Sequence, residues 1–150
     1  MKFSTRHDTD LPPDRLFDMV SDFPRLEKLL MRRGASVRRI DPSAELGVGR
    51  AWDVGFDWRG RRRDLRLDLT RFDRPETVAL SGQGESFSLR FTMTVIALTR
   101  QKSRLMAELE LRPQNMRARL ILQTAKLGKT QLDQRFHKQV VRLIEDLAAA

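Results

Sequence analysis

Residues 116–149 have the periodicity of one long amphipathic helix, and this feature constrains the fold more than any other. Apolar residues recur there at spacings of three, four and seven, which places them on one face at 3.6 residues per turn. They are Ala118, Leu122, Ala125, Leu132, Phe136, Val140, Leu143 and Leu147. A helix of this length spans roughly 50 Å. Its apolar face needs a partner, and a wide, curved sheet has the right size to supply one.

The first half of this helix differs from the second. Asn115 is a suitable N-cap. Gly128, in the middle, costs up to about 1 kcal/mol relative to alanine, so it predicts a kink, a close approach by sheet or ligand, or only a local weak point. Before Gly128 the opposite side also carries Met116, Leu120 and Leu127. We therefore expect the first half to be covered on two sides, or else to be adhesive.

The composition bounds the protein to one domain without disulfides or thiolate metal ligands. A chain of 150 residues can bury roughly 70% of its unfolded surface around a single core, so we expect one domain over residues 1–150. With no cysteine and only two histidines, we expect neither a metal nor another cofactor. The N-terminus lacks an apolar signal segment, and no stretch has the length of a membrane span. These features predict a cytoplasmic protein.

The net charge of +9 attracts nucleic acid or anionic membranes by itself. The basic residues alternate with acidic ones instead of forming a long block, which disfavours nucleic acid as a partner. A solvated, arginine-rich surface and a peripheral contact with an anionic membrane both stay open. We expect a monomer or a weak homodimer.

The N-terminal part predicts a strand and two short helices. Residues 2–8 alternate, with Phe3, Thr5 and His7 on the inward face. Two prolines at residues 12 and 13 then end the strand and open a short helix. A Ser-Asp-Phe-Pro sequence at residues 21–24 separates it from a second short helix that ends at Gly34.

From residue 35 onward a period of two predicts six strands, near residues 35–40, 52–58, 65–70, 78–80, 87–97 and 105–111. The strand over 87–97 is predicted to be the longest, and Gly82 and Gly84 are predicted to turn or bulge the chain before it. Short connections make consecutive strands antiparallel neighbours. The expected fold is α+β: a curved, seven-stranded antiparallel sheet with two short helices after the first strand, covered by the long C-terminal helix. This is a helix-grip fold.

Three segments carry a resemblance to a known family. Residues 11–24, Leu-Pro-Pro-Asp-Arg-Leu-Phe-Asp-Met-Val-Ser-Asp-Phe-Pro, resemble the opening of the START-like superfamily, also called SRPBCC, and especially its polyketide cyclase and coenzyme Q-binding branch. Residues 47–52 resemble the family's entry to its third strand, and residues 111–113 with the helix after them resemble its ending. The resemblance implies a Bet v 1/START-like helix-grip fold that binds apolar molecules between sheet and helix. Only some members are enzymes.

The inward-facing residues are almost wholly apolar, as in a filled core or in the lining of an apolar pocket. The resemblance favours a cavity. The candidate ligand-binding residues are Trp52, Val54, Phe56, Trp58, Leu67, Leu80, Phe91, Met93, Leu109, Leu122, Ala125, Leu132 and Phe136. We expect the ligand to be a small apolar molecule such as a lipid, a quinone or a polyketide.

Catalysis would need polar groups directed into that space. His7 and Thr5 are the clear inward candidates, and Arg39, Arg71 and Gln123 join them if strand ends or helix rotation differ. A lone histidine on an apolar face is more often a packed core residue, and no nucleophile with a paired base is visible. A carrier is therefore expected, with an aromatase or polyketide cyclase as the alternative. A cyclase needs several converging polar groups, whereas a carrier needs one or two.

An arginine-rich turn is a second candidate site. Trp58 is followed by Arg59, Arg61, Arg62 and Arg63 in a predicted hairpin. The strand order places this hairpin at the same end of the sheet as the turn at residues 84–85 and the junction at residues 112–115. It would contact an acidic head group or an anionic membrane, or it is only a solvated hairpin. A second alternative function is thus a basic-surface module for membranes or RNA.

Overall fold

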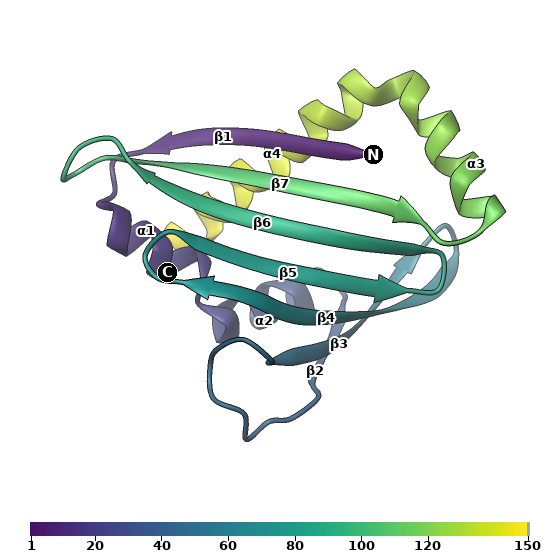
Figure 1. The fold of residues 1–150 in the computed structure, drawn as a ribbon, viewed down its shortest axis with the longest axis horizontal. Helices are drawn as coiled ribbons and strands as arrows, with labels where there is room; N and C mark the ends of the chain where they lie inside the picture. Colours follow the sequence, from purple (N-terminus) through teal and green to yellow (C-terminus); the bar gives the residue numbers. More distant parts are fainter. Residues whose placement is uncertain (150) are drawn as a thin grey trace.

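Seven antiparallel strands form one twisted sheet, and helices cover one of its faces (Figure 1). The computed structural model describes residues 1–149. The elements are β1 (Lys2–Thr9), α1 (Pro13–Val20), α2 (Phe23–Arg32), β2 (Ser36–Arg39), β3 (Ala51–Trp58), β4 (Arg61–Asp73), β5 (Thr77–Gly84), β6 (Phe87–Ala97), β7 (Ser103–Pro113), α3 (Met116–Ala125), a 3-10 turn η1 (Lys126–Gly128) and α4 (Lys129–Ala148). No helix among residues 1–149 is long and apolar enough to cross a membrane.

The strand order across the sheet is β1-β7-β6-β5-β4-β3-β2. Strands β2 to β7 are a meander, as their short connections require. Strand β1 pairs with β7, with Phe3 opposite Leu109, so that the first and last strands of the chain are neighbours. The expected fold class and element order are confirmed.

The two short helices supply buried residues to the core, Leu16, Phe17 and Val20 from α1 and Phe23 from α2. Pro13 opens α1, and the side chain of Asp22 accepts a hydrogen bond from the backbone N–H of Arg25 at the start of α2. Between the helices, the Ser21 hydroxyl donates to the Phe17 carbonyl at 2.7 Å. Leu16 and Phe17 are buried almost completely. This end of the molecule is filled, because α1 and the C-terminal end of α4 pack together there.

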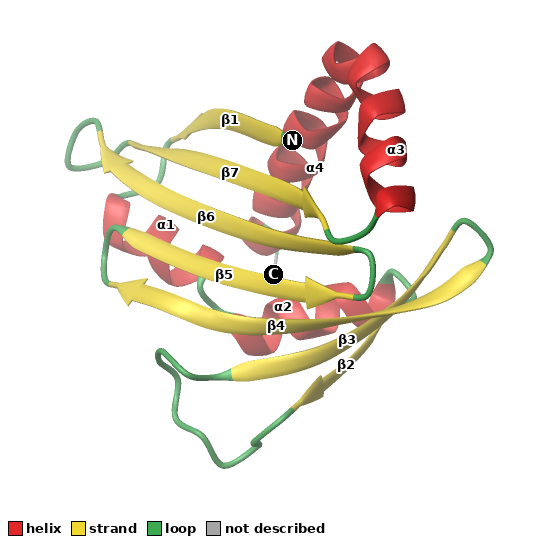
Figure 2. Cartoon of the chain, turned by 45° about the vertical axis from the view of Figure 1, so that its right-hand side comes forward, coloured by secondary structure: helices red, strands yellow, loops and turns green. Residues whose placement is uncertain are grey.

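The C-terminal helix is bent, not straight. Asn115 caps α3 as expected, because its side chain accepts from the backbone N–H of Ala118 at 2.8 Å. The turn η1 then redirects the chain, so that α4 lies across the sheet while α3 leans away from it (Figure 2). A side chain at Gly128 would meet nothing within 4 Å, so the glycine marks a kink and not a close approach.

Two details of the sheet differ from expectation. The longest strand is β4, with 13 residues, and not the strand over residues 87–97, because pairing begins directly at the hairpin and continues through a bulge between Leu69 and Arg71. Gly82 does not turn the chain. It pairs with Leu67 and Leu89 inside the ladder, and the Leu89 side chain occupies the space of a missing Cβ.

We expect Gly82→Ala to destabilise the protein by about 1–3 kcal/mol, because the new Cβ would lie 2.6 Å from Cγ of Leu89 and force that packed side chain to move. Urea unfolding followed by circular dichroism measures the effect. The matched control is Gly128→Ala, which meets no neighbour and should leave stability unchanged or raise it by up to about 1 kcal/mol. Equal stability of both variants would contradict this account of Gly82.

Candidate functional site

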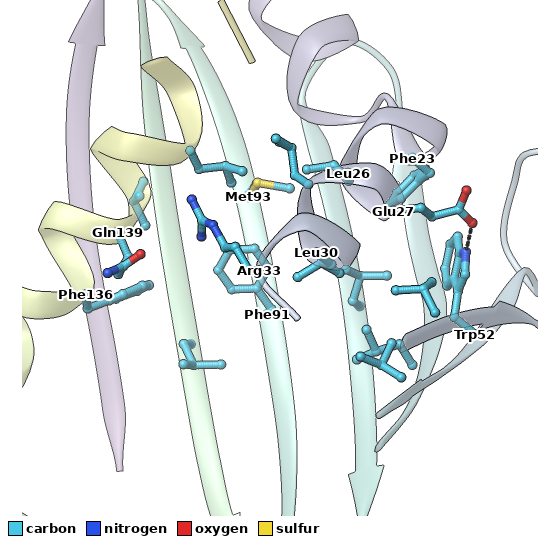
Figure 3. Close-up of a pocket in the computed structure, with 18 of the residues that line it drawn as sticks. Phe23, Leu26, Glu27, Leu30, Arg33, Trp52, Phe91, Met93, Phe136 and Gln139 are labelled. Atoms are coloured by element: carbon cyan, nitrogen blue, oxygen red, sulfur yellow. Dashed lines mark hydrogen bonds between the residues drawn. The ribbon is translucent and has the colours of Figure 1, made fainter. Parts of the chain in front are cut away.

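A cavity of about 520 Å³ lies between the sheet and helices α2 and α4 (Figure 3). The sheet supplies its floor and the two helices its walls. The sequence candidates that line it are Trp52, Val54, Leu67, Leu80, Phe91, Met93, Leu109, Leu132 and Phe136. Further apolar lining comes from Phe3, Phe23, Leu26, Leu29, Leu30, Val37, Val140 and Leu143. The space is therefore a preformed apolar cavity and not a filled core.

Four candidates lie outside this cavity. Phe56 and Trp58 are further along β3, beside a separate hollow at the β3–β4 hairpin. Leu122 is buried on α3, and Ala125 is half-buried there. Because the chain bends at η1, the face of α3 no longer continues the face of α4 above the cavity.

The polar candidates are also placed elsewhere. Neither His7 nor Thr5 lines the cavity, and the Thr5 hydroxyl is hydrogen-bonded to Nδ1 of His137 on α4. Arg71 is exposed and paired with an aspartate on its own strand, and Gln123 is exposed on α3. The structure therefore brings none of these four groups to the cavity.

Aromatic contacts hold the walls to the floor. The ring of Phe136 on α4 lies 6.0 Å from that of Phe3 on β1 and 6.5 Å from that of Phe91 on β6. On the opposite side, the rings of Phe23 on α2 and Trp52 on β3 are 5.1 Å apart. Such contacts stabilise by more than their buried area alone. They fix the distance between helices and sheet without filling the space between them.

Glu27 is the polar centre of the α2 wall, and the sequence analysis missed it. Its carboxylate accepts two hydrogen bonds from Arg39, both of 2.8 Å, and one of 2.7 Å from the indole nitrogen of Trp52. Its side chain is only 13% exposed. The hydrogen bond from Arg39 lowers the pKa of Glu27 below its usual value, against the opposing effect of burial, and the bond from Trp52 lowers it further. Phe23 and Glu27 are four residues apart and so lie on one helix face. This spacing was the sequence signal that could have identified Glu27 as an inward residue.

Two more polar residues, Arg33 and Gln139, line the cavity between α2 and α4. Arg33 follows the last turn of α2 and reaches toward α4, where Gln139 lies (Figure 3). Its Nη2 donates to Oδ2 of Asp146 at 3.1 Å. Neither residue carries a sequence signal, because Arg33 follows the end of α2 and Gln139 lies at the polar edge of α4.

The arginine-rich hairpin is divided between the two faces of the sheet. Trp58 is 37% exposed and lies edge-on to Phe87, with the guanidinium groups of Arg59 and Arg63 at 4.9 and 5.4 Å from its ring centre. Arg62 points the other way and donates to the Ser36 hydroxyl at 2.6 Å. The hairpin lies at the end of the sheet where β7 passes into α3, as the strand order predicted (Figures 1 and 2).

The second apolar side of α3 is uncovered. Met116, Leu120 and Leu127 are 66%, 55% and 90% exposed. This half of the helix is therefore not covered on two sides, and its adhesion stays a prediction. Within residues 1–149, no three histidine, aspartate or glutamate side chains gather as metal ligands would.

We expect Glu27→Gln to lower the free energy of unfolding by roughly 1–3 kcal/mol at pH 7, because hydrogen bonds to a charged group are lost. The pKa of Glu27 is lowered on folding, so its charge stabilises the fold fully above the unfolded value of 4.5 and less as the pH falls through the folded value. Unfolding curves measured between pH 7 and pH 3 should therefore converge for parent and variant. Glu110→Gln, at the exposed pair with Arg112, is the control and should change stability less. A difference that persists undiminished in acid would contradict the assignment.

No protein-family model matches the sequence, and no curated protein sequence is detectably similar to it. Solved structures match it at the level of the fold. The Zhui aromatase/cyclase from Streptomyces sp. R1128 superposes with a TM-score of 0.70 at 10% identity, over 99% of this chain and 93% of that one. Norcoclaurine synthase from Thalictrum flavum superposes with a TM-score of 0.68 at 13% identity, over 99% and 86%.

A START superfamily protein from Mycobacterium smegmatis superposes with a TM-score of 0.59 at 12% identity, over 93% of this chain and 98% of that one. At such identities the likeness concerns the fold alone. Together with the sheet order and the C-terminal helix, these matches show that the chain has the START-like helix-grip fold.

Proposed function

We propose that this protein binds and carries a small hydrophobic molecule, a lipid, a quinone or a polyketide-like compound, in the cavity between the sheet and α4. The observation that carries the proposal is the cavity itself. Its volume of about 520 Å³ is in the range of small-molecule sites, and its lining is almost entirely apolar. Each methylene group that a ligand buries there would contribute about 0.8 kcal/mol.

The structural neighbours support this proposal at the level of the fold. One of them is an aromatase/cyclase, and another was crystallised in complex with dopamine and hydroxybenzaldehyde. The same architecture thus holds small organic molecules in other proteins.

Catalysis by an aromatase or cyclase mechanism is the alternative, and the number of polar groups in the cavity disfavours it. Within residues 1–149 these groups are Glu27, Arg33 and Gln139. Glu27 is already engaged by Arg39 and Trp52, so it has little capacity for proton transfer to a ligand. Mass spectrometry of molecules that co-purify with the native protein separates the two functions. An apolar lipid or a quinone supports carriage, and a polyketide supports the enzyme.

Filling the cavity floor should abolish ligand uptake without unfolding the protein. Leu80 and Leu109 flank Phe91 on the two neighbouring strands. We expect the double variant Leu80→Trp/Leu109→Trp to bind the neutral dye Nile red at least tenfold more weakly, as measured by fluorescence titration. In a filled core the same change would overpack and cost several kcal/mol, roughly 1–3 per site.

The control for this experiment is Leu120→Trp, which adds the same side chain on the exposed face of α3. It should bind Nile red as the parent does. Undiminished dye binding by the floor variant, or no binding by the parent, would refute the cavity as the binding site.

A second candidate function is peripheral contact with anionic membranes at the end of the sheet that carries the hairpin and α3. It is favoured by the exposure of Leu127 and Leu120 beside basic residues, since residues 116–129 contain four arginines or lysines and no acidic residue. Apolar residues inserted among lipids and basic residues near the head groups are the two components of such docking. Exposed aliphatic residues favour a membrane over RNA, which is bound mainly through charge and stacking.

Two variants test this contact by co-sedimentation with phosphatidylserine-containing vesicles at low salt. We expect Arg59→Gln/Arg61→Gln to weaken binding, because each arginine near the surface contributes about 1 kcal/mol. Leu120→Gln/Leu127→Gln should also weaken it, through lost insertion. The control Arg6→Gln/Arg90→Gln removes two exposed charges from the opposite face of the sheet and should sediment as the parent does. If the parent does not sediment, or if all three variants behave alike, the membrane contact is wrong.

A further inference from the structure

We infer that the ligand is an amphiphile with an anionic head group, a carboxylate or a phosphate, and that Arg33 binds this head group where the cavity opens between α2 and α4. The inference rests on the proposed function and specifies its ligand class.

The apolar cavity adjoins a basic groove. The groove has a volume of about 830 Å³ and lies between α2 and the end of α4. Leu29 and Arg33 line both the groove and the cavity, so the two spaces share a wall. Arg33 and Arg25 on the α2 side both reach Asp146 on α4, the first through the carboxylate and the second through the backbone carbonyl at 3.2 Å. A chain held in the cavity would therefore leave it beside Arg33.

The charge of the groove is strongly positive. Its basic residues are Arg25, Lys28, Arg32, Arg33 and Arg142, against the two acids Asp22 and Asp146. Both acids are engaged, Asp22 in capping α2 and Asp146 by Arg33. Among residues 1–149, the side chains of Lys28, Arg32 and Arg142 have neither a hydrogen-bond nor an ion-pair partner. Among the described residues, the groove thus has five basic side chains against two acidic ones.

Arg33 has unused donors directed at this opening. A guanidinium group carries five N–H donors, and Arg33 uses Nη2 for its contact with Asp146. Gln139, which lines the cavity with it, has no hydrogen-bond partner among the described residues. A carboxylate or a phosphate matches the geometry of a guanidinium group better than any neutral head group does.

The opposite polar residue of the cavity cannot serve a cationic ligand in the same way. Both oxygens of Glu27 accept hydrogen bonds from Arg39, and one also accepts from Trp52. The other polar residues of the cavity are the cationic Arg33 and the neutral amide Gln139, and both lie between α2 and α4. An apolar chain below and an anion at Arg33 fit this asymmetry.

The experiment measures displacement of Nile red from the intact protein by three molecules with the same twelve-carbon chain: dodecanoate, dodecyl phosphate and dodecanol. Because Arg33 lines the cavity, the affinity of each variant for the neutral dye Nile red is titrated first, and every displacement is expressed relative to it. In the parent we expect the anions to displace Nile red at about tenfold lower concentration than the alcohol does, because a charge-assisted hydrogen bond to Arg33 is stronger than a neutral one. The ratio between dodecanoate and dodecyl phosphate distinguishes a fatty acid from a phosphate-bearing lipid as the natural source.

Three variants assign the preference to Arg33. Arg33→Gln should bring the affinities for the anions within about twofold of that for dodecanol in the same variant, whereas Arg33→Lys should keep part of the preference. Arg90→Gln, which removes an exposed charge that alternates with Phe91 and so lies on the other face of the sheet, should keep all of it.

The outcomes separate this inference from the proposed function. Equal affinity for alcohol and anions in the parent, or a preference that survives Arg33→Gln, overturns the anion site while the hydrophobic cavity stands. If none of the three molecules displaces Nile red from the parent, both proposals are wrong. Melting temperatures of the variants confirm that each one is folded.

Discussion

The packing of α4 on the sheet is the contact on which the rest of the structure depends. At its C-terminal end, Val140, Ile144 and Leu147 are buried against α1 and the strands, and this closes the core. Towards its start, α4 meets the sheet through Phe136, whose ring touches Phe3 and Phe91 only edge-on. Helix α4 is thus packed tightly at its C-terminal end and contacts the sheet through the ring of Phe136 towards its start. The space beneath it stays open.

The cavity persists because its walls are fixed by interactions that do not need a filled interior. Aromatic pairs join α4 and α2 to the floor, and the partly buried hydrogen bonds of Glu27 tie α2 to β2 and β3. A buried carboxylate without partners would destabilise the fold, so Glu27, Arg39 and Trp52 act as a unit. The hydrogen bonds from Arg39 and Trp52 engage Glu27, the acidic residue of the cavity lining. The other polar residues of that lining are Arg33 and Gln139.

The bend at η1 separates the two halves of the C-terminal helix in their surroundings as well as in direction. The second half covers the cavity, whereas the first half packs on the end of β7 and exposes its other side. Leu127, at the bend, is almost fully exposed beside Lys126 and Lys129. A straight helix would have carried Leu122 and Ala125 over the sheet and left less apolar surface in solvent.

Periodicity in the sequence determined the element order and the inner face of each strand, because alternation with a period of two puts every second side chain on one face whatever lies above it. Short connections then determined the order of the meander. For this reason Trp52, Val54, Leu80, Phe91 and Leu109 were identified as inward residues from local pattern alone. The cap at Asn115 and the interruption at Gly128 were also predicted from the local sequence, because both depend on the residue type at one position.

Only the tertiary structure decided which inward residues surround a cavity and which polar residues join them. Phe56 and Trp58 follow the inward pattern, but β3 twists away from α4 before it reaches them. They therefore lie beside the hollow at the β3–β4 hairpin and not in the cavity. Glu27 and Arg33 became cavity residues because α2 is placed over β2 and β3, and a helix pattern records only which residues share a face, not what that face meets. Gly82 is likewise explained by a neighbour on another strand. The side chain of Leu89 on β6 occupies the space beside it, and the local sequence around Gly82 does not predict this contact. Local periodicity is a property of the backbone, whereas cavities and grooves arise from the distance between elements, and that distance depends on every contact between them.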